Sequence, residues 1–156
     1  MNISRVKSHA KINLALNVTG KTFKLHKIES IIAFISLYDD ILIKEINSNK
    51  HKISFTGKFS NNIGKNNSVS KLLEVLEKKK LLLNKKFKIK IEKHIPLKSG
   101  LGGGSMNAAN ILKYLINKRI VIIPKKEIRK ICDSVGSDVI LGLNLKNSIL
   151  TSKNQI

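Results

Sequence analysis

The sequence of 156 residues contains no tryptophan, one cysteine and two prolines, and aromatic residues make up only 4% of it. With so few aromatic side chains, a hydrophobic core must consist mainly of Ile and Leu. The single cysteine, Cys132, excludes an internal disulfide and suits a reducing compartment. Because Cys132 lies in an apolar helical stretch, we expect a buried structural thiol. Neither a membrane-spanning apolar run nor the apolar run of a signal peptide is present, so we expect a cytoplasmic protein.

Acidic residues are also scarce. The chain has 10 aspartates and glutamates against 30 lysines and arginines, which gives a formal net charge of +20. Such a charge permits a nucleic-acid partner. However, arginine occurs only at Arg5, Arg119 and Arg129, and the lysines are scattered along the chain. Joint enrichment in Lys, Asn and Ile is what a biased genome composition gives. We therefore expect solvated lysines rather than a nucleic-acid interface, although a basic surface would still steer an anionic nucleotide substrate.

The pattern of apolar residues predicts the elements of the fold, because strands alternate and helices repeat every three or four positions. The expected strands are residues 2–7, 11–18, 27–37, 40–46, 51–56 and 86–94. The expected helices are about 68–80, with Ser68 as its N-cap, about 105–118, and about 125–134, opened by Pro124. Short apolar segments at 138–143 and 147–151 predict an ordered turn and a further strand. Strands without regular β-α alternation favour an α+β fold in a single domain, residues 1–156.

Four glycines within five positions join the strand expected at 86–94 to the helix that follows. A glycine loop that leads into a helix aims unpaired backbone N–H groups at an anion, and phosphate is the expected occupant. Ser105 either caps this helix or donates its hydroxyl to the ligand. The stretch is neither a Walker A loop, since no Gly-Lys-Ser/Thr follows, nor a dinucleotide fingerprint, since Ser105 replaces the third glycine. The alternative interpretation is a glycine-rich turn without a ligand.

Residues 96–109, Pro-Leu-Lys-Ser-Gly-Leu-Gly-Gly-Gly-Ser-Met-Asn-Ala-Ala, closely resemble the second motif of the GHMP kinases, which include galactokinase, homoserine kinase and mevalonate kinase. Two other segments agree in the same order, Ala-Lys-Ile-Asn-Leu-Ala-Leu at 10–16 and Gly-Ser-Asp-Val at 136–139. The resemblance covers nearly the whole chain. It implies the N-terminal domain of these kinases, a sheet with helices packed on one side, which is related to a domain of a small-subunit ribosomal protein.

The details of these motifs are most like the family members that phosphorylate a hydroxyl of 4-diphosphocytidyl-2-C-methyl-D-erythritol in non-mevalonate isoprenoid (terpenoid) synthesis. The resemblance therefore implies an ATP-dependent kinase with a nucleotide-linked small-molecule substrate. The implied ATP-binding residues are Asn67, Lys93, Pro96, Leu97, Lys98, Ser99, Gly100, Leu101, Gly102, Gly103, Gly104 and Ser105. Mg²⁺ would arrive with ATP, held by phosphate oxygens and water, because no His/Cys cluster has the spacing of a protein metal site.

The resemblance also implies roles for residues outside the loop. Asp138 accepts or orients the proton of the acceptor hydroxyl, and Lys11 lies beside it. This pair is physically sensible, because an ammonium keeps a carboxylate ionised and stabilises charge on the attacking oxygen. Asn13 is implied as a polar contact to the acceptor. His26 falls where the family reads the cytosine, although Leu25 replaces the tyrosine that usually precedes it.

Further departures leave several interpretations open. His9, Met106 and Ile140 differ from the family pattern, and no third glycine-rich motif of a second domain follows. We therefore expect either a fragment of a longer two-domain kinase or a truncated product. The alternatives are another GHMP kinase with a different small alcohol, an inactive remnant, and a non-catalytic basic RNA-binding domain of the related ribosomal fold.

Overall fold

The computed structural model describes residues 2–21, 26–144 and 146–150, and it contains one five-stranded sheet. The strands are β1 (Ser4–Lys21), β2 (His26–Ile46), β3 (Lys52–Thr56), β4 (Lys86–Glu92) and β5 (Ser148–Leu150). Their order is β1-β2-β4-β3, with β5 also paired to β2. The β3–β4 pair is parallel and the other pairs are antiparallel.

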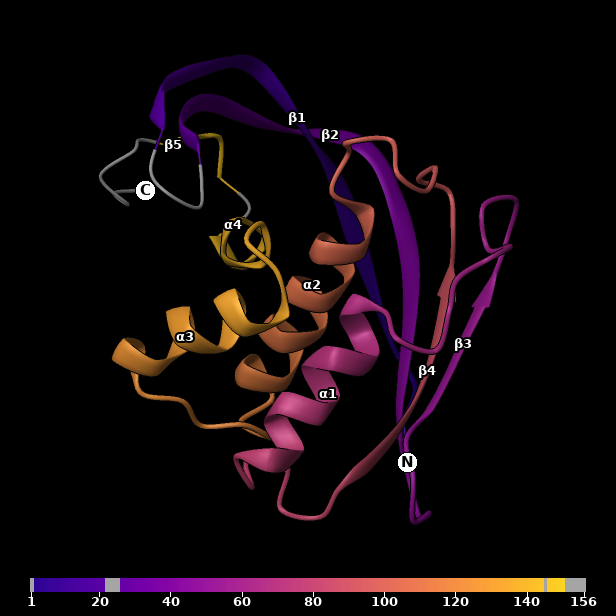
Figure 1. Ribbon diagram of the computed structural model, residues 1–156. Coiled ribbons are helices and arrows are strands. Elements are labelled where there is room, and N and C mark those ends of the chain that lie inside the picture. Colours follow the sequence, from indigo (N-terminus) through magenta and orange to yellow (C-terminus); the bar gives the residue numbers. More distant parts are fainter. Residues whose placement is uncertain (1, 22–25, 145, 151–156) are drawn as a thin grey trace.

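The helices lie together on one face of this sheet (Figure 1). They are α1 (Ser68–Lys78), α2 (Gly103–Asn117), α3 (Lys125–Val135) and α4 (Val139–Asn144). The expected α+β architecture with helices on one side is thus confirmed. In the described part of the chain, no helix has the length and apolar character that a membrane crossing requires.

The core between the sheet and the helices consists mainly of Ile and Leu, as the scarcity of aromatic residues predicts. On β4 the odd-numbered positions Phe87, Ile89 and Ile91 are buried, while the lysines between them are exposed. Their helical partners are Val69, Leu72, Leu73 and Leu76 of α1 and Ala108, Ile111, Leu112 and Leu115 of α2. Cys132 is also buried in this core, and burial raises the pKa of its thiol to about 11. It is therefore a structural thiol, as predicted.

Two predicted strand breaks are wrong. Residues 2–7 and 11–18 belong to the single strand β1, and residues 27–37 and 40–46 belong to the single strand β2. The apparent breaks lie opposite each other in the sheet, where Ser8 pairs with Asp39 and His9 with Tyr38, and a bulge follows between His9 and Lys11. Pairing between distant segments therefore overrides the local interruption of the apolar pattern.

Three details of the predicted helices also need correction, although α1 begins at Ser68 as expected. The N-cap of α1 is Asn67, not Ser68, because the Asn67 side chain accepts hydrogen bonds from Val69 N and Ser70 N. Helix α2 begins two residues earlier than predicted, after Gly102, so Ser105 lies within its first turn and does not cap it. Residues 139–144 form the short helix α4 instead of an ordered turn. Pro124 immediately precedes α3, close to its predicted place.

Candidate functional site

The glycine loop connects the end of β4 to α2 and borders a pocket of about 220 Å³. The pocket is lined by Ser68, Lys93, Pro96, Leu97, Lys98, Ser99, Gly100, Gly102, Gly103, Gly104 and Ser105. Most residues that the resemblance assigns to ATP therefore share one hollow. Leu101 does not line it, and its carbonyl instead accepts a hydrogen bond from Lys11 N at 3.0 Å.

At Gly102 and Gly103 the backbone of this loop leaves no room for a larger side chain. Gly102 has φ +70°, and a Cβ there would lie 2.9 Å from Lys11 Cγ. A Cβ on Gly103 would lie 3.0 Å from Ile95 Cγ2 and 3.2 Å from Lys93 Nζ. The hydrogen-bond ladder of α2 starts where Met106 N donates to Gly102 O, so the N–H groups of Gly103, Gly104 and Ser105 precede it. These donors at the positive end of the helix suit an anion such as phosphate.

Beside the loop, Lys11 of β1 meets Asp138 of the α3–α4 connection. Lys11 Nζ lies 3.4 Å from Asp138 Oδ2, and it donates to Asn13 Oδ1 at 3.2 Å. The Lys11 side chain is 8% exposed, whereas that of Asp138 is 38% exposed. The fold therefore brings together an ammonium, a carboxylate and an amide from segments more than 120 residues apart, at the edge of the glycine loop.

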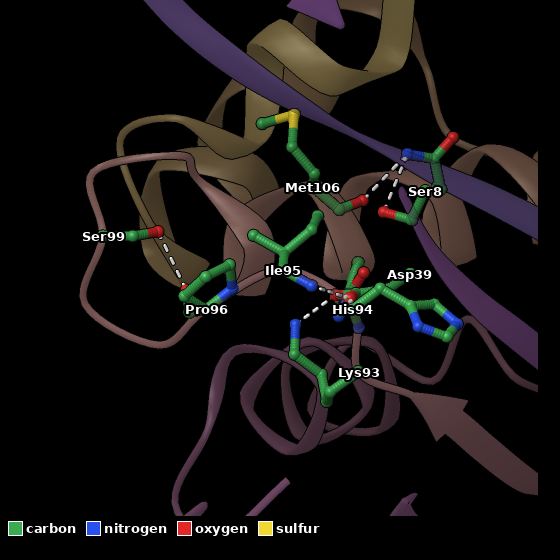
Figure 2. Close-up of polar contacts among 10 residues, drawn as sticks. Ser8, Asp39, Lys93, His94, Ile95, Pro96, Ser99 and Met106 are labelled. Atoms are coloured by element: carbon green, nitrogen blue, oxygen red, sulfur yellow. Dashed lines mark hydrogen bonds and ion pairs between the residues drawn. The ribbon is translucent and has the colours of Figure 1, made fainter. Parts of the chain in front are cut away.

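A second lysine–aspartate pair lies beneath the loop (Figure 2). Asp39 of β2 is fully buried, and its Oδ1 accepts hydrogen bonds from His94 N at 2.8 Å and Ile95 N at 2.9 Å. Its Oδ2 pairs with Lys93 Nζ and accepts a hydrogen bond from Asn107 Nδ2 at 2.9 Å. One carboxylate thereby joins β2, the start of the glycine loop and the first turns of α2.

The sequence patterns single out neither Asp39 nor Asn107 as residues of the site, and Asp39 falls between the strands expected at 27–37 and 40–46. A signal was present, because an acidic residue interrupts a long apolar stretch in a chain with only 10 acidic residues. A buried carboxylate requires a partner. Nothing in the local pattern, however, indicates that this partner lies 54 residues away in the sequence.

The neighbouring Asp40 points to the opposite face of the sheet, since successive strand residues alternate. Arg5 Nε and Nη2 donate to its two oxygens, both at 2.9 Å, and this hydrogen-bonded guanidinium holds the pKa of Asp40 below its ordinary value. Asp40, Glu92 and His94 have potential metal-ligand atoms within 4.8 Å of one another. Because Arg5 engages both Asp40 oxygens, this group is arranged as an ion-pair cluster rather than as a cation site.

The remaining residues that the resemblance assigns lie in three different settings. Lys93 lines the pocket, but its side chain is only 2% exposed and its ammonium is paired with Asp39. Asn67 lies outside the pocket lining, and its side chain caps α1 while Nδ2 donates to Gly64 O at 3.0 Å. The side chain of His26 lies outside the described residues.

Comparisons with known proteins agree with this geometry. Residues 67–145 match the family model described as the GHMP kinases N terminal domain. The chain is 57% identical over 156 residues to the 4-diphosphocytidyl-2-C-methyl-D-erythritol kinase of Pelagibacter ubique (strain HTCC1062), covering 100% of this chain and 56% of that protein. It is 36% identical over 140 residues to the kinase of the same name from Clostridioides difficile (strain 630), covering 89% of this chain and 47% of that protein.

Among solved structures, the crystal structure of a 4-(cytidine 5'-diphospho)-2C-methyl-D-erythritol kinase superposes with a TM-score of 0.76 and 25% sequence identity. The superposition covers 94% of this chain and 51% of that chain. The chain thus spans about half the length of the curated relatives it matches.

Proposed function

The chain belongs to the GHMP kinase family, and we propose that it supplies the nucleotide-binding part of a kinase acting in non-mevalonate isoprenoid synthesis. In this proposal the terminal phosphate of ATP is transferred to a hydroxyl of 4-diphosphocytidyl-2-C-methyl-D-erythritol, the compound in the names of the relatives. The observation that carries the proposal is the convergence of Lys11 and Asp138 beside the glycine loop.

The glycine loop would hold the triphosphate. The early N–H groups of α2 suit phosphate oxygens, and the tight packing at Gly102 and Gly103 supports a backbone shape kept for a ligand. Mg²⁺ bound with ATP would neutralise charge on the phosphate oxygens during transfer. Ser68 at the start of α1 also lines the pocket. We therefore infer that Asn67 serves the adenosine side indirectly, by capping the helix that presents Ser68.

Lys11 and Asp138 would act on the acceptor. The proton of the acceptor hydroxyl passes to an Asp138 carboxylate oxygen, while the acceptor oxygen forms a bond to the γ-phosphorus. The bond from that phosphorus to the oxygen that bridges it to the β-phosphate breaks, and ADP leaves. The Lys11 ammonium stabilises negative charge that develops on the attacking oxygen. The hydrogen bond from Lys11 N to Leu101 O holds Lys11 beside the glycine loop that would bind the phosphates.

Two residues are proposed to select the acceptor. The Asn13 amide accepts from Lys11 Nζ, which leaves its NH₂ group as a donor for an acceptor hydroxyl. His26 is proposed to hydrogen-bond the cytosine, on the strength of the family resemblance. Lys93, finally, is proposed to add positive charge under the phosphates while it remains paired with Asp39.

The test is turnover of ATP with the cytidine-linked acceptor and magnesium, compared between the unaltered protein, Asp138→Asn and the matched control Asp133→Asn. Asp133 is an exposed aspartate of α3, away from the pocket. We expect Asp138→Asn to lower kcat by about 10²–10⁴-fold, the usual range for loss of a general base, and Asp133→Asn to leave it unchanged. The affinity for magnesium–ATP should be similar in all three proteins.

The same measurement is made on a chimaera in which the remaining part of the Pelagibacter relative follows this chain, so that the site is also tested in a protein of the relatives' length. Full turnover by Asp138→Asn in both forms would contradict the assigned base. Turnover of a different small alcohol in place of the cytidine-linked acceptor would correct the substrate alone. Absence of magnesium–ATP binding would contradict the phosphate cradle.

A further inference from the structure

The face of the sheet opposite the helices carries a hollow of about 660 Å³, which shares no lining residue with the pocket at the glycine loop. Its lining includes Leu42, Lys44 and Ile46 of β2, which alternate with the buried Ile41 and Ile43 that face the helices. Lys52 of β3 and Lys88 and Lys90 of β4 complete its basic part. A volume of this size falls within the range of small-molecule sites.

The strand register places the lysines of this hollow directly against one another. Lys44 of β2 is the cross-strand partner of Lys88 of β4, and Lys88 is in turn the partner of Lys52 of β3. Lys90 lies two residues along β4 on the same face. Like charges that are directly opposite each other destabilise a sheet. Repulsion among the ammonium groups of this row of three lysines therefore destabilises the folded sheet.

These lysines differ from many others in the molecule. Elsewhere lysines pair with carboxylates, as in Lys78–Glu74 at 2.8 Å and Lys85–Glu45 at 3.0 Å. Within the described residues, none of the four lysines of the hollow has an ion pair or a side-chain hydrogen bond. The one carboxylate of the lining is Glu45, which Lys85 already engages. The positive charge of the hollow is thus uncompensated by the protein.

The floor of the hollow is apolar. Leu42 and Ile46 are half-buried on either side of Lys44, and Ile3, at the rim, is 63% exposed. Lysine side chains add apolar stems beneath their ammonium groups. An apolar floor bordered by ammonium groups matches a molecule with an apolar body and an anionic head.

We propose that this hollow is a second anion site, which binds a small organic anion with an apolar body and a phosphate-like head of two or more negative charges. Neither arginine nor an aromatic ring belongs to its lining among the described residues, so bidentate phosphate contacts and base stacking by an RNA have no support there. A second copy of this strongly basic chain would be repelled. The proposal does not depend on the kinase function proposed above.

Titration calorimetry with decyl phosphate, below the concentration at which it forms micelles, tests the proposal at physiological salt. Three probes separate the contributions: inorganic phosphate has the charge alone, decyl maltoside has the chain alone, and magnesium–ATP reports on the glycine pocket. We expect decyl phosphate to bind at least about tenfold more tightly than either partial probe. A tenfold difference in affinity requires only about 1.4 kcal/mol of binding free energy. Saturating magnesium–ATP should not displace it.

The informative variant is Lys88→Gln, at the centre of the lysine row, and its matched control is Lys71→Gln, an exposed lysine of α1 on the other side of the sheet. Lys88→Gln should weaken decyl phosphate binding about fivefold or more, as loss of one ion pair does. The same substitution should raise the melting temperature of the unliganded protein, because it removes two opposed like-charge pairs. Lys71→Gln should change neither quantity.

Several results would overturn the proposal. Failure of decyl phosphate to bind, equal affinity in Lys88→Gln and the unaltered protein, or displacement by magnesium–ATP would each do so. A short single-stranded RNA that binds with sensitivity to Lys88→Gln, while decyl phosphate does not bind, would assign the face to nucleic acid instead.

Discussion

Two lysine–aspartate pairs flank the same glycine loop, and their surroundings differ. Lys93 and Asp39 are buried beneath it, and both oxygens of Asp39 have hydrogen-bond partners. Lys11 and Asp138 lie at its edge, with a longer separation of 3.4 Å and a half-exposed carboxylate. The same residue types therefore lie in different environments, and the two pairs differ most in the accessibility of the carboxylate.

The buried pair is suited to holding the loop in shape. Removing two charges from water is costly, and the cost is offset only when the remaining polar groups are also satisfied. Here the backbone N–H groups of His94 and Ile95 and the amide of Asn107 satisfy Asp39. The Lys11–Asp138 pair has the reverse character, because the partly exposed carboxylate of Asp138 keeps oxygen lone pairs available to a hydroxyl proton.

The strongest way to break this comparison is Asp39→Asn, which leaves the buried ammonium of Lys93 without an opposite charge. Loss of one partner of a buried pair costs about 3–5 kcal/mol, so the free energy of unfolding should fall by that amount in urea denaturation. The matched control is Asp40→Asn, because the Arg5 side chain that pairs with Asp40 is 65% exposed. The free energy of unfolding should fall clearly less in Asp40→Asn than in Asp39→Asn. Equal losses in the two variants would remove the distinction between them.

Gly102→Ala should have the next largest effect. A residue with a side chain at φ +70° costs about 1–2 kcal/mol, and the new Cβ would also press on Lys11 at 2.9 Å. The matched control is Gly100→Ala, where φ is +77° but no atom lies within 4 Å of the added Cβ. Both variants should lose stability in thermal denaturation, whereas turnover should fall further in Gly102→Ala. Equal turnover in the two would show that the position of Lys11 is unimportant.

The glycine loop was within reach of the sequence, because it is a short contiguous motif with a specific residue pattern. The proximity of Lys11 and Asp138, which are far apart in the sequence, was expected only from the family resemblance. Helices α1, α2 and α3 were also predictable from their 3.6-residue apolar repeat, whereas the short helix α4 was not. The end of β4 and the start of α2 were then placed to within two residues. These are the parts of the fold that local sequence determines.

The contacts of the buried Asp39 carboxylate were not within reach, because its partners meet it only in the folded chain and neither the local pattern nor the resemblance points to Asp39. Asp39 and Asn107 are 68 residues apart, and each lies inside an element whose pattern gives it no special weight. The continuity of β1 and of β2 was not predicted for the same reason. Ser8 and Asp39 interrupt the apolar patterns of the two strands, and only the fold shows that these positions are paired. Asn67 was assigned to the nucleotide by resemblance, and its place as an N-cap emerged only from the backbone geometry.

Asn67→Ala tests that last assignment and should have a smaller effect. Loss of an N-cap side chain costs about 1 kcal/mol, and Asn67→Asp should restore most of it, because aspartate caps equally well. Urea denaturation checks this, with Asn66→Ala, an exposed neighbour before the cap, as the control. A full loss of magnesium–ATP binding in Asn67→Ala that Asn67→Asp does not rescue would instead favour a direct contact with the nucleotide.

The smallest expected change in stability belongs to Asp138→Asn, the substitution with the largest expected effect on turnover. A partly exposed ion pair contributes less than about 1 kcal/mol, because water and salt screen it and its side chains lose freedom when they pair. Unfolding in urea should therefore be nearly unchanged, while Asp39→Asn unfolds at much lower urea. If Asp138→Asn lost as much stability as Asp39→Asn, both aspartates would be structural, and the proton acceptor would have to be sought elsewhere. A stable but inactive Asp138→Asn would separate the residue that supports the loop from the residue that uses it.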